Sequence, residues 1–189
     1  KNSDNGIVIN NTANRALTLK NCKLENVLNA INHSKGTNTI TCTLLGNGND
    51  FGTSATSQYA KYVLAAADAT LTAPEGYTVT TTVENSLVKY VDGAYKVVPA
   101  VAKIGDVCYE TLADAIAAIG EGDVTIVLLA NASLDITAWQ TLAIGGDNTT
   151  SITIDGDNGE EEDFTLTFNK LNSDWNHVAT SNDNATKLI

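Results

Sequence analysis

The fold is set by an alternating stretch at residues 16–24, which reads Ala-Leu-Thr-Leu-Lys-Asn-Cys-Lys-Leu. Leu17 and Leu19, and then Cys22 and Leu24, alternate with polar residues, which is the period of a half-buried β-strand. Residues 38–44 (Asn-Thr-Ile-Thr-Cys-Thr-Leu) repeat the pattern, and residues 6–10 are a third alternating segment. Placing Leu17 and Leu19 over Ile40 and Cys42 gives an offset of about 23 residues, a length typical of one turn of a β-solenoid. We therefore expect stacked parallel strands with apolar ladders inside.

The composition supports an uncharged surface around such strands. Charged residues make up 17% of the chain, against roughly 25% in ordinary soluble proteins. Asn is abundant between the predicted strands, where it tolerates left-handed backbone angles and bonds its own neighbours. The three cysteines, Cys22, Cys42 and Cys108, match no zinc spacing, and we expect each to be a small buried hydrophobic residue.

The sequence pattern changes in the middle of the chain. Residues 59–72 fit either a helix or a further buried strand. Two hairpins follow, one turning at Asp92-Gly93 and one at Gly105-Asp106. The next segment predicts a helix, with Thr111 as N-cap, apolar residues on one face and Gly120 at its end. Strands then return: residues 124–129 predict a buried strand, and residues 151–156 and 164–168 alternate.

These elements predict a mainly β protein with coils of a right-handed parallel β-helix at both ends of the chain. Residues 1–73 would form the last coils of one β-helix, and residues 74–110 a β-hairpin linker. Residues 111–189 would form a short amphipathic helix and the opening coils of another β-helix. The helix has a physical role in this arrangement, because the first coil of a solenoid exposes its apolar interior and needs a cover.

Several segments resemble a known family. Residues 74–77 (Pro-Glu-Gly-Tyr), 95–99 (Tyr-Lys-Val-Val-Pro), 101–106 (Val-Ala-Lys-Ile-Gly-Asp) and 109–116 (Tyr-Glu-Thr-Leu-Ala-Asp-Ala-Ile) resemble repeats in large secreted surface proteins of gut Firmicutes. In that family the passage continues through a strand like residues 124–129 into one like residues 151–156. The resemblance covers residues 74–168. It implies a right-handed parallel β-helix of the pectate-lyase-like superfamily at the cell surface or outside the cell, and says little about activity.

Charge and chain ends suggest how such coils are used. Residues 1–50 contain five basic and three acidic groups, whereas residues 120–189 contain two and twelve. The sequence has no Met, and its last residues, 185–189, read as a strand that residues 1–9 continue. We expect an excised repeat whose copies join head to tail, as a tandem polyprotein or a non-covalent filament. Stacking of both β portions within one molecule stays open as an alternative.

The remaining partners follow from composition. A net charge of −11 with one arginine, Arg15, argues against nucleic acid as a partner. No apolar run is long enough for a membrane span. Surface glycans are the other candidate partner, because Trp139, Trp175, Tyr59, Tyr62 and Tyr77 could supply stacking faces for a glycan-binding adhesin. The same rings could instead plug coil ends or cover the hairpins, and we favour that role.

Candidate chemistry is sparse. In the acidic run at residues 155–163, Asp155, Asp157 and Asp163 are weak calcium-ligand candidates, since the spacing departs from an EF-hand and a solvated loop explains the run as well. The pectate-lyase-like resemblance raises polysaccharide lysis, but Arg15 alone is a poor base, and His33 and His177 lie in polar loops without a nucleophile. We therefore expect no catalytic residues, no cofactor and a structural module rather than an enzyme.

Overall fold

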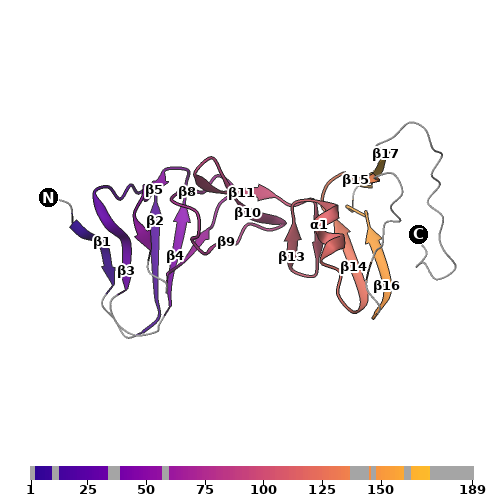
Figure 1. Cartoon of the computed structure of the whole chain (residues 1–189), viewed down its shortest axis with the longest axis horizontal. Helices are drawn as coiled ribbons and strands as arrows, with labels where there is room; N and C mark the ends of the chain where they lie inside the picture. The colour runs from indigo at the N-terminus through magenta and orange to yellow at the C-terminus, as the bar shows by residue number, and fades with distance from the viewer. Residues whose placement is uncertain are drawn as a thin grey trace. The chain divides into compact units, whose positions relative to one another are not determined.

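The computed structural model describes residues 3–9, 13–33, 39–56, 60–136, 145, 148–159 and 163–170, and these are mainly β. They divide into two compact units, Lys1–Val98 and Pro99–Ile189. The first hairpin of the predicted linker belongs to the first unit and the second hairpin to the second. Each unit is described separately below (Figure 1).

The first unit contains eleven of the strands described. They are β1 (Ser3–Ile9), β2 (Arg15–Lys20), β3 (Val27–His33), β4 (Ile40–Leu45), β5 (Asn49–Asp50), β6 (Ala55–Thr56), β7 (Ala60–Leu64), β8 (Thr70–Thr72), β9 (Val79–Thr81), β10 (Ser86–Val91) and β11 (Ala94–Pro99). The sheets have the orders β1-β3-β6, β2-β4-β7-β9 and β10-β11-β8-β5.

The chain visits these three sheets in the same order three times. It passes through β1, β2 and a bridge from Lys23 to Asp50, then β3, β4 and β5, then β6, β7 and β8. Strands of successive passes pair in parallel, as β1 with β3, β2 with β4, and β5 with β8. Within the ambiguous stretch at residues 59–72, Ala60–Leu64 and Thr70–Thr72 are strands, and none of its described residues is helical.

The predicted register is wrong by two residues. Leu17 pairs with Cys42 and Leu19 with Leu44, a separation of 25 residues rather than 23. Because two residues are one full side-chain period of a strand, the same side chains still face inward. The added length lies in the connection, where Asn21 and Asn26 have φ values of 52° and 57°.

A strand that the alternation did not predict explains that connection. β3 occupies residues taken as an Asn-rich turn, and it places His33 at a strand end rather than in a loop. It pairs in parallel with β1. The Asn29 amide donates to the Asp4 carbonyl and to Asn5 Oδ1, both at 3.1 Å. Its Asn residues thus bond across neighbouring strands, not within their own turn as we expected.

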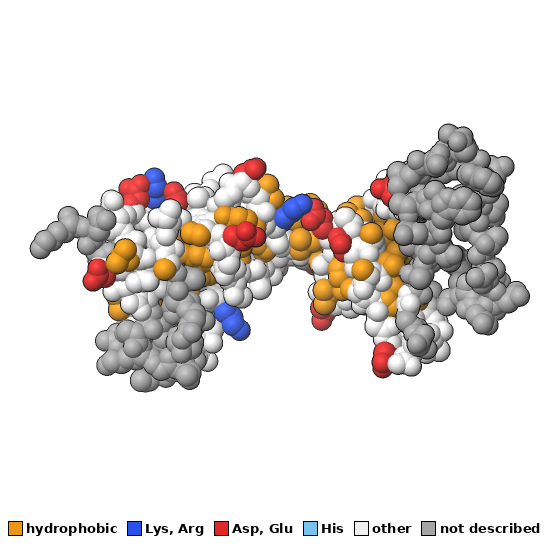
Figure 2. All heavy atoms as spheres, viewed as in Figure 1, with side chains coloured by type: hydrophobic (Ala, Val, Ile, Leu, Met, Phe, Trp, Pro, Cys, Tyr) orange, Lys and Arg blue, Asp and Glu red, His pale blue; other side chains and the backbone are white. Residues whose placement is uncertain are grey.

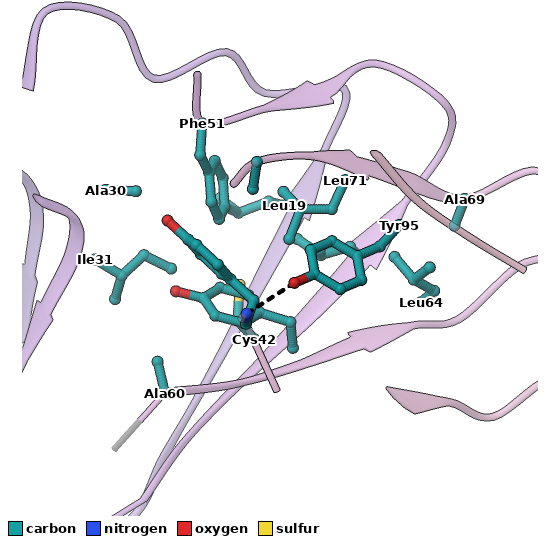
Figure 3. Packing of buried hydrophobic residues seen from close by; sticks show 14 of the residues in the cluster. Leu19, Ala30, Ile31, Cys42, Phe51, Ala60, Leu64, Ala69, Leu71 and Tyr95 are labelled. Atoms are coloured by element: carbon teal, nitrogen blue, oxygen red, sulfur yellow. Dashed lines mark hydrogen bonds between the residues drawn. The ribbon is translucent and has the colours of Figure 1, made fainter. Parts of the chain in front are cut away.

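The core of the first unit lies between the three sheets. Figure 3 shows side chains from different sheets pointing toward one another, including Ile31, Cys42, Phe51 and Leu71. All four are fully buried. The Asp92-Gly93 turn is confirmed, with φ values of 53° and 79°, which match the two left-handed positions of a type I′ turn.

The second unit combines a hairpin, a helix and two parallel strand pairs. Its elements are β12 (Ala102–Ile104), β13 (Val107–Tyr109), α1 (Leu112–Ala117), β14 (Gly122–Leu128), β15 (Ala132–Ile136), β16 (Thr149–Asp155) and β17 (Leu166–Lys170). β14 pairs in parallel with β16, and β15 with β17. β12 is antiparallel to both β13 and β14, which confirms the Gly105-Asp106 hairpin.

The predicted helix is present and covers part of this core. Thr111 is its N-cap, and the Thr111 hydroxyl accepts a hydrogen bond from the Asp114 N–H at 3.0 Å. Leu112, Ala115 and Ile116 are buried against the strands. The helix ends at Ala118, two residues before the predicted Gly120.

Candidate assembly interface

The strands β1 and β2 form an open edge of the first unit. In the described part of the chain, each is hydrogen-bonded to one neighbour, β1 to β3 and β2 to β4. An edge strand presents a row of backbone N–H and C=O groups on its other side, which is a template for a further strand. We call β1 and β2 the N-terminal edge.

Burial along the inward ladders changes at this edge. Ile7 and Leu17 are half-buried, although their register partners in the next pass, Ile31 and Cys42, have no exposed surface. Both are partly buried side chains packed against the core, whereas Leu19 on the same edge strand is buried. The N-terminal edge therefore exposes the apolar interior that the inner strands keep from water.

The C-terminal strands show the same gradient. Ile126 on β14 is fully buried, whereas its partner Ile154 on β16 is half-buried. On the neighbouring pair, Ala132 is buried and its partner Leu166 is half-buried. Among the described strands, β16 and β17 each have one neighbour. We call these two strands the C-terminal edge.

The opposite end of the first unit's ladders is covered by aromatic rings. There β8 pairs antiparallel with β11, so the hairpin of β10 and β11 closes the third sheet. The Tyr77 ring packs 5.3 Å from Tyr62 and 6.3 Å from Tyr95, between ring centroids. The Tyr77 N–H donates to Tyr95 Oη at 2.7 Å (Figure 3), and the Tyr77 hydroxyl donates to the Ser54 carbonyl. Burial, followed by the nearby Tyr95, raises the pKa of Tyr77 to about 12.

A buried asparagine ties three successive passes of the chain together. Asn49 is 1% exposed. Its Oδ1 accepts from the Cys22 N–H at 3.2 Å, and its amide donates to the carbonyls of Leu45, Gly46 and Thr70 at 3.0, 3.2 and 3.3 Å. Composition predicted many turn asparagines but not this one, because only the register shows which of them is enclosed by three turns.

Charge differs between the two edges. Arg15 and Lys20 lie exposed at the two ends of β2. Asp4 lies exposed on β1. The C-terminal edge carries Asp155 at the end of β16 and Lys170 at the end of β17, and Asp163 precedes β17. On the face drawn in Figure 2, the described residues of each unit present mostly uncharged side chains and backbone. Lys23 is already paired with Glu25 at 2.6 Å, which raises the pKa of Lys23.

The calcium candidates are partly engaged by their own loop. Asp155 Oδ1 accepts from the Asp157 N–H at 3.0 Å, and Asp157 Oδ1 accepts from the Gly159 N–H at 2.8 Å. Asp163 is exposed. No group of three or more His, Cys, Asp or Glu side chains in the described residues is placed to hold a metal ion. Calcium binding by this loop stays a prediction.

Two of the five aromatic candidates for sugar stacking face the core. Tyr62 is fully buried and Tyr77 is 9% exposed, so neither offers a ring face to a glycan. Their contacts match the role that we favoured, the covering of the ladder end by the hairpin. Tyr59, Trp139 and Trp175 lie outside the described residues.

The cysteines follow the prediction only in part. Cys42 is buried, and burial raises the pKa of its thiol to about 12, with a smaller contribution from Cys22. Such a thiol stays protonated at neutral pH and is a poor nucleophile. Cys22 and Cys108 are half-buried. His177, the second histidine considered, lies outside the described residues.

Comparisons with known proteins assign neither a family nor a function to this chain. No family model, no curated protein and no solved structure matches this chain. In the described residues, no helix has the length and apolar character needed to cross a membrane.

Proposed function

We propose that this chain is a structural, non-enzymatic module of an extracellular or cell-surface protein. In this proposal, the strands at both ends of the chain are turns of a right-handed parallel β-helix. Turns of one copy stack head to tail on turns of the next and build a fibre, filament or stalk. The handedness and the location come from the resemblance to surface-protein repeats. The three ordered visits to three sheets support the β-helix.

The proposal rests on the incomplete burial of the inward-facing apolar side chains on the edge strands. Ile7 and Leu17 on one edge, and Ile154 and Leu166 on the other, are half-buried beside fully or nearly fully buried partners. A stacked turn would remove this apolar surface from water and would satisfy the edge N–H and C=O groups. Because the two edges differ in sequence, the contact is heterologous, and it builds an open filament when the rotation between copies does not close a ring.

The test is sedimentation velocity over a wide concentration range, combined with electron microscopy. We expect the wild-type protein to form linear assemblies that grow with concentration. Ile7→Lys places a charge on the inward face of β1 and should abolish them. Only monomers of the wild-type protein at high concentration would contradict the proposal.

A matched control lies next to Ile7. Val8 is on the same strand and is 52% exposed. Val8→Lys therefore adds the same charge to the edge strand on its outer face, and should leave assembly nearly intact. Equal loss of assembly in both variants, with wild-type circular dichroism, would show that charge on β1 rather than an inward apolar contact controls association.

A further inference from the structure

The second unit is capped on the side where its chain begins. There β12 pairs antiparallel with β14, and β13 outside it is three residues long. A very short edge strand is a common means of preventing further pairing. α1 contacts β14 and β15, and its buried side chains belong to the same core. The second unit is therefore open to further turns at the C-terminal edge, as the first unit is at the N-terminal edge.

The outer turn of the second unit is its least buried part. The buried residues of its hydrophobic core lie on β12, α1, β14 and β15, and among the described residues none lies on β16 or β17. The turns of a solenoid cannot bury their apolar faces alone, and about three or more stacked turns are needed for stability. The described strands of the second unit form two turns, and no described strand covers the outer one.

A single chain cannot supply that cover from its own first unit. Stacking the C-terminal edge on the N-terminal edge would join two turns to three turns, with β12 at one end of the stack and β11 at the other. At the usual strand spacing, β12 and β11 would then lie about 29 Å apart. Only residues 100–101 connect these strands, and the chain from Pro99 to Ala102 spans at most about 11 Å. The covering turns must therefore come from a second copy of this sequence.

We propose that the second unit is one part of a β-helix domain that the first unit of a second copy completes. Each joint between copies is then a single cooperatively folded domain, which we call the composite domain. It ends at α1 and β12 on one side and at the β10–β11 hairpin on the other. A fibre is therefore a row of composite domains and not one continuous β-helix. This inference rests on the proposed head-to-tail function and specifies what each joint is.

The experiment mixes two end-blocked chains, Ile7→Lys and Ile154→Lys, in equal amounts. Ile154→Lys places a charge on the inward face of β16, so the joint can form only from the second unit of the Ile7→Lys chain and the first unit of the Ile154→Lys chain. Labelling one chain with ¹⁵N distinguishes their peptides in hydrogen exchange measured by mass spectrometry. In the mixture, we expect slower exchange than in either chain alone, in β2 and β4 of the Ile154→Lys chain and in β14 and β16 of the Ile7→Lys chain.

A conservative change in the second unit tests whether the joint folds as one domain. Ile126 is fully buried on β14. Ile126→Val in the Ile7→Lys chain should speed exchange of β7 in the Ile154→Lys chain about fivefold, because the composite domain opens as a whole. Exchange of β7 in its own chain should not change.

Ile40→Val in the Ile7→Lys chain is the matched control. Ile40 is also fully buried, but it lies on β4, in the first unit of that chain, which forms no joint in the mixture. The same loss of one methylene group should therefore speed exchange of β7 in its own chain and leave the Ile154→Lys chain unchanged.

The outcomes separate this inference from the proposed function. If the mixture contains no heterodimer, head-to-tail stacking fails and the composite domain fails with it. If a heterodimer forms but Ile126→Val does not change β7 of the Ile154→Lys chain, the copies stack as separately folded units. The proposed function would then stand and the composite domain would be overturned. An effect of Ile126→Val on β7 of its own chain would also overturn it, since the two units of one chain would then fold together.

Discussion

The two ends of the first unit's ladders are finished in opposite ways. At one end, the β10–β11 hairpin closes a sheet by antiparallel pairing, and Tyr77 and Tyr95 cover the apolar interior. At the other end, β1 and β2 leave Ile7 and Leu17 half-buried. In the proposed assembly, this unit stops growing at the hairpin and accepts a further turn at the N-terminal edge.

The largest expected effect is a difference in unfolding free energy between a substitution on an inner strand and one on an edge strand. Leu44→Ala should lower the free energy of unfolding by about 2–5 kcal/mol, because it removes a fully buried side chain and leaves a cavity. Leu17→Ala should cost only about 1 kcal/mol in the monomer, since the side chain is half-buried. Urea denaturation at low protein concentration measures both. Equal losses would mean that the N-terminal edge is as well covered as the interior.

The second prediction concerns the asparagine that joins three turns. Asn49→Ala should cost about 2–3 kcal/mol, because it leaves the buried partners of the amide unsatisfied. Asn29→Ala is the control near the open edge, where the side chain is half-buried and water can replace its bonds. We expect a loss of about 1 kcal/mol there. The same denaturation curves report both changes, and a reversed order would break the comparison.

The third prediction concerns the pH dependence of stability that Tyr77 produces at the end covered by the hairpin. The pKa of Tyr77 is about 12 in the folded protein, against 10.0 in an unfolded chain. The unfolded state therefore releases the phenol proton first. The stabilisation is complete below pH 10 and is lost as the pH rises through about 12. Tyr77→Phe should flatten this part of the pH profile of unfolding and cost about 1 kcal/mol at pH 8.

The pH experiment needs a comparison between variants, because Cys42 acts with the same sign. Its thiol pKa is also about 12, so a residual alkaline loss of stability should remain in Tyr77→Phe. Unchanged alkaline sensitivity in Tyr77→Phe would mean that the hairpin does not bury the phenol.

The smallest effect is expected at the cover of the second unit. Thr111→Ala removes the hydroxyl that caps α1 and should lower the unfolding free energy by about 1 kcal/mol. Thr111→Ser keeps that hydroxyl and serves as the control. Thermal unfolding of the three proteins would show whether this short helix contributes to stability, and no difference would show that α1 is held by packing alone.

Strand patterns and turn residues in the sequence predicted much of the fold. Alternation predicted β2, β4, β16 and β17, an apolar run predicted β14, and the Gly-containing turns predicted both hairpins. β15 was not predicted. β3 was missed because Asn29 and Asn32 interrupt its apolar alternation, although they bond to Asn5 on β1. The two-residue register error has a different origin, because the side-chain period alone does not distinguish offsets that differ by two.

The candidate interface was predicted only in outline. Chain order and charge suggested which ends meet, but the half-burial of Ile7 and Ile154 depends on which strands lack a neighbour. Likewise, the sugar-stacking role of Tyr62 and Tyr77 is wrong because the fold turns both rings inward. The number of aromatic residues does not tell whether a ring faces the core or the solvent. That depends on how the strands pair.

The most direct test of the central claim mixes two end-blocked variants. Ile7→Lys disables the N-terminal edge, and Ile154→Lys disables the C-terminal edge, so each alone should be monomeric. Mixed in equal amounts, they should form 1:1 heterodimers that do not grow, because one intact edge of each kind remains. Sedimentation equilibrium with one variant labelled measures this. Monomers in the mixture, under conditions where the wild-type protein assembles, would contradict head-to-tail stacking of these two edges.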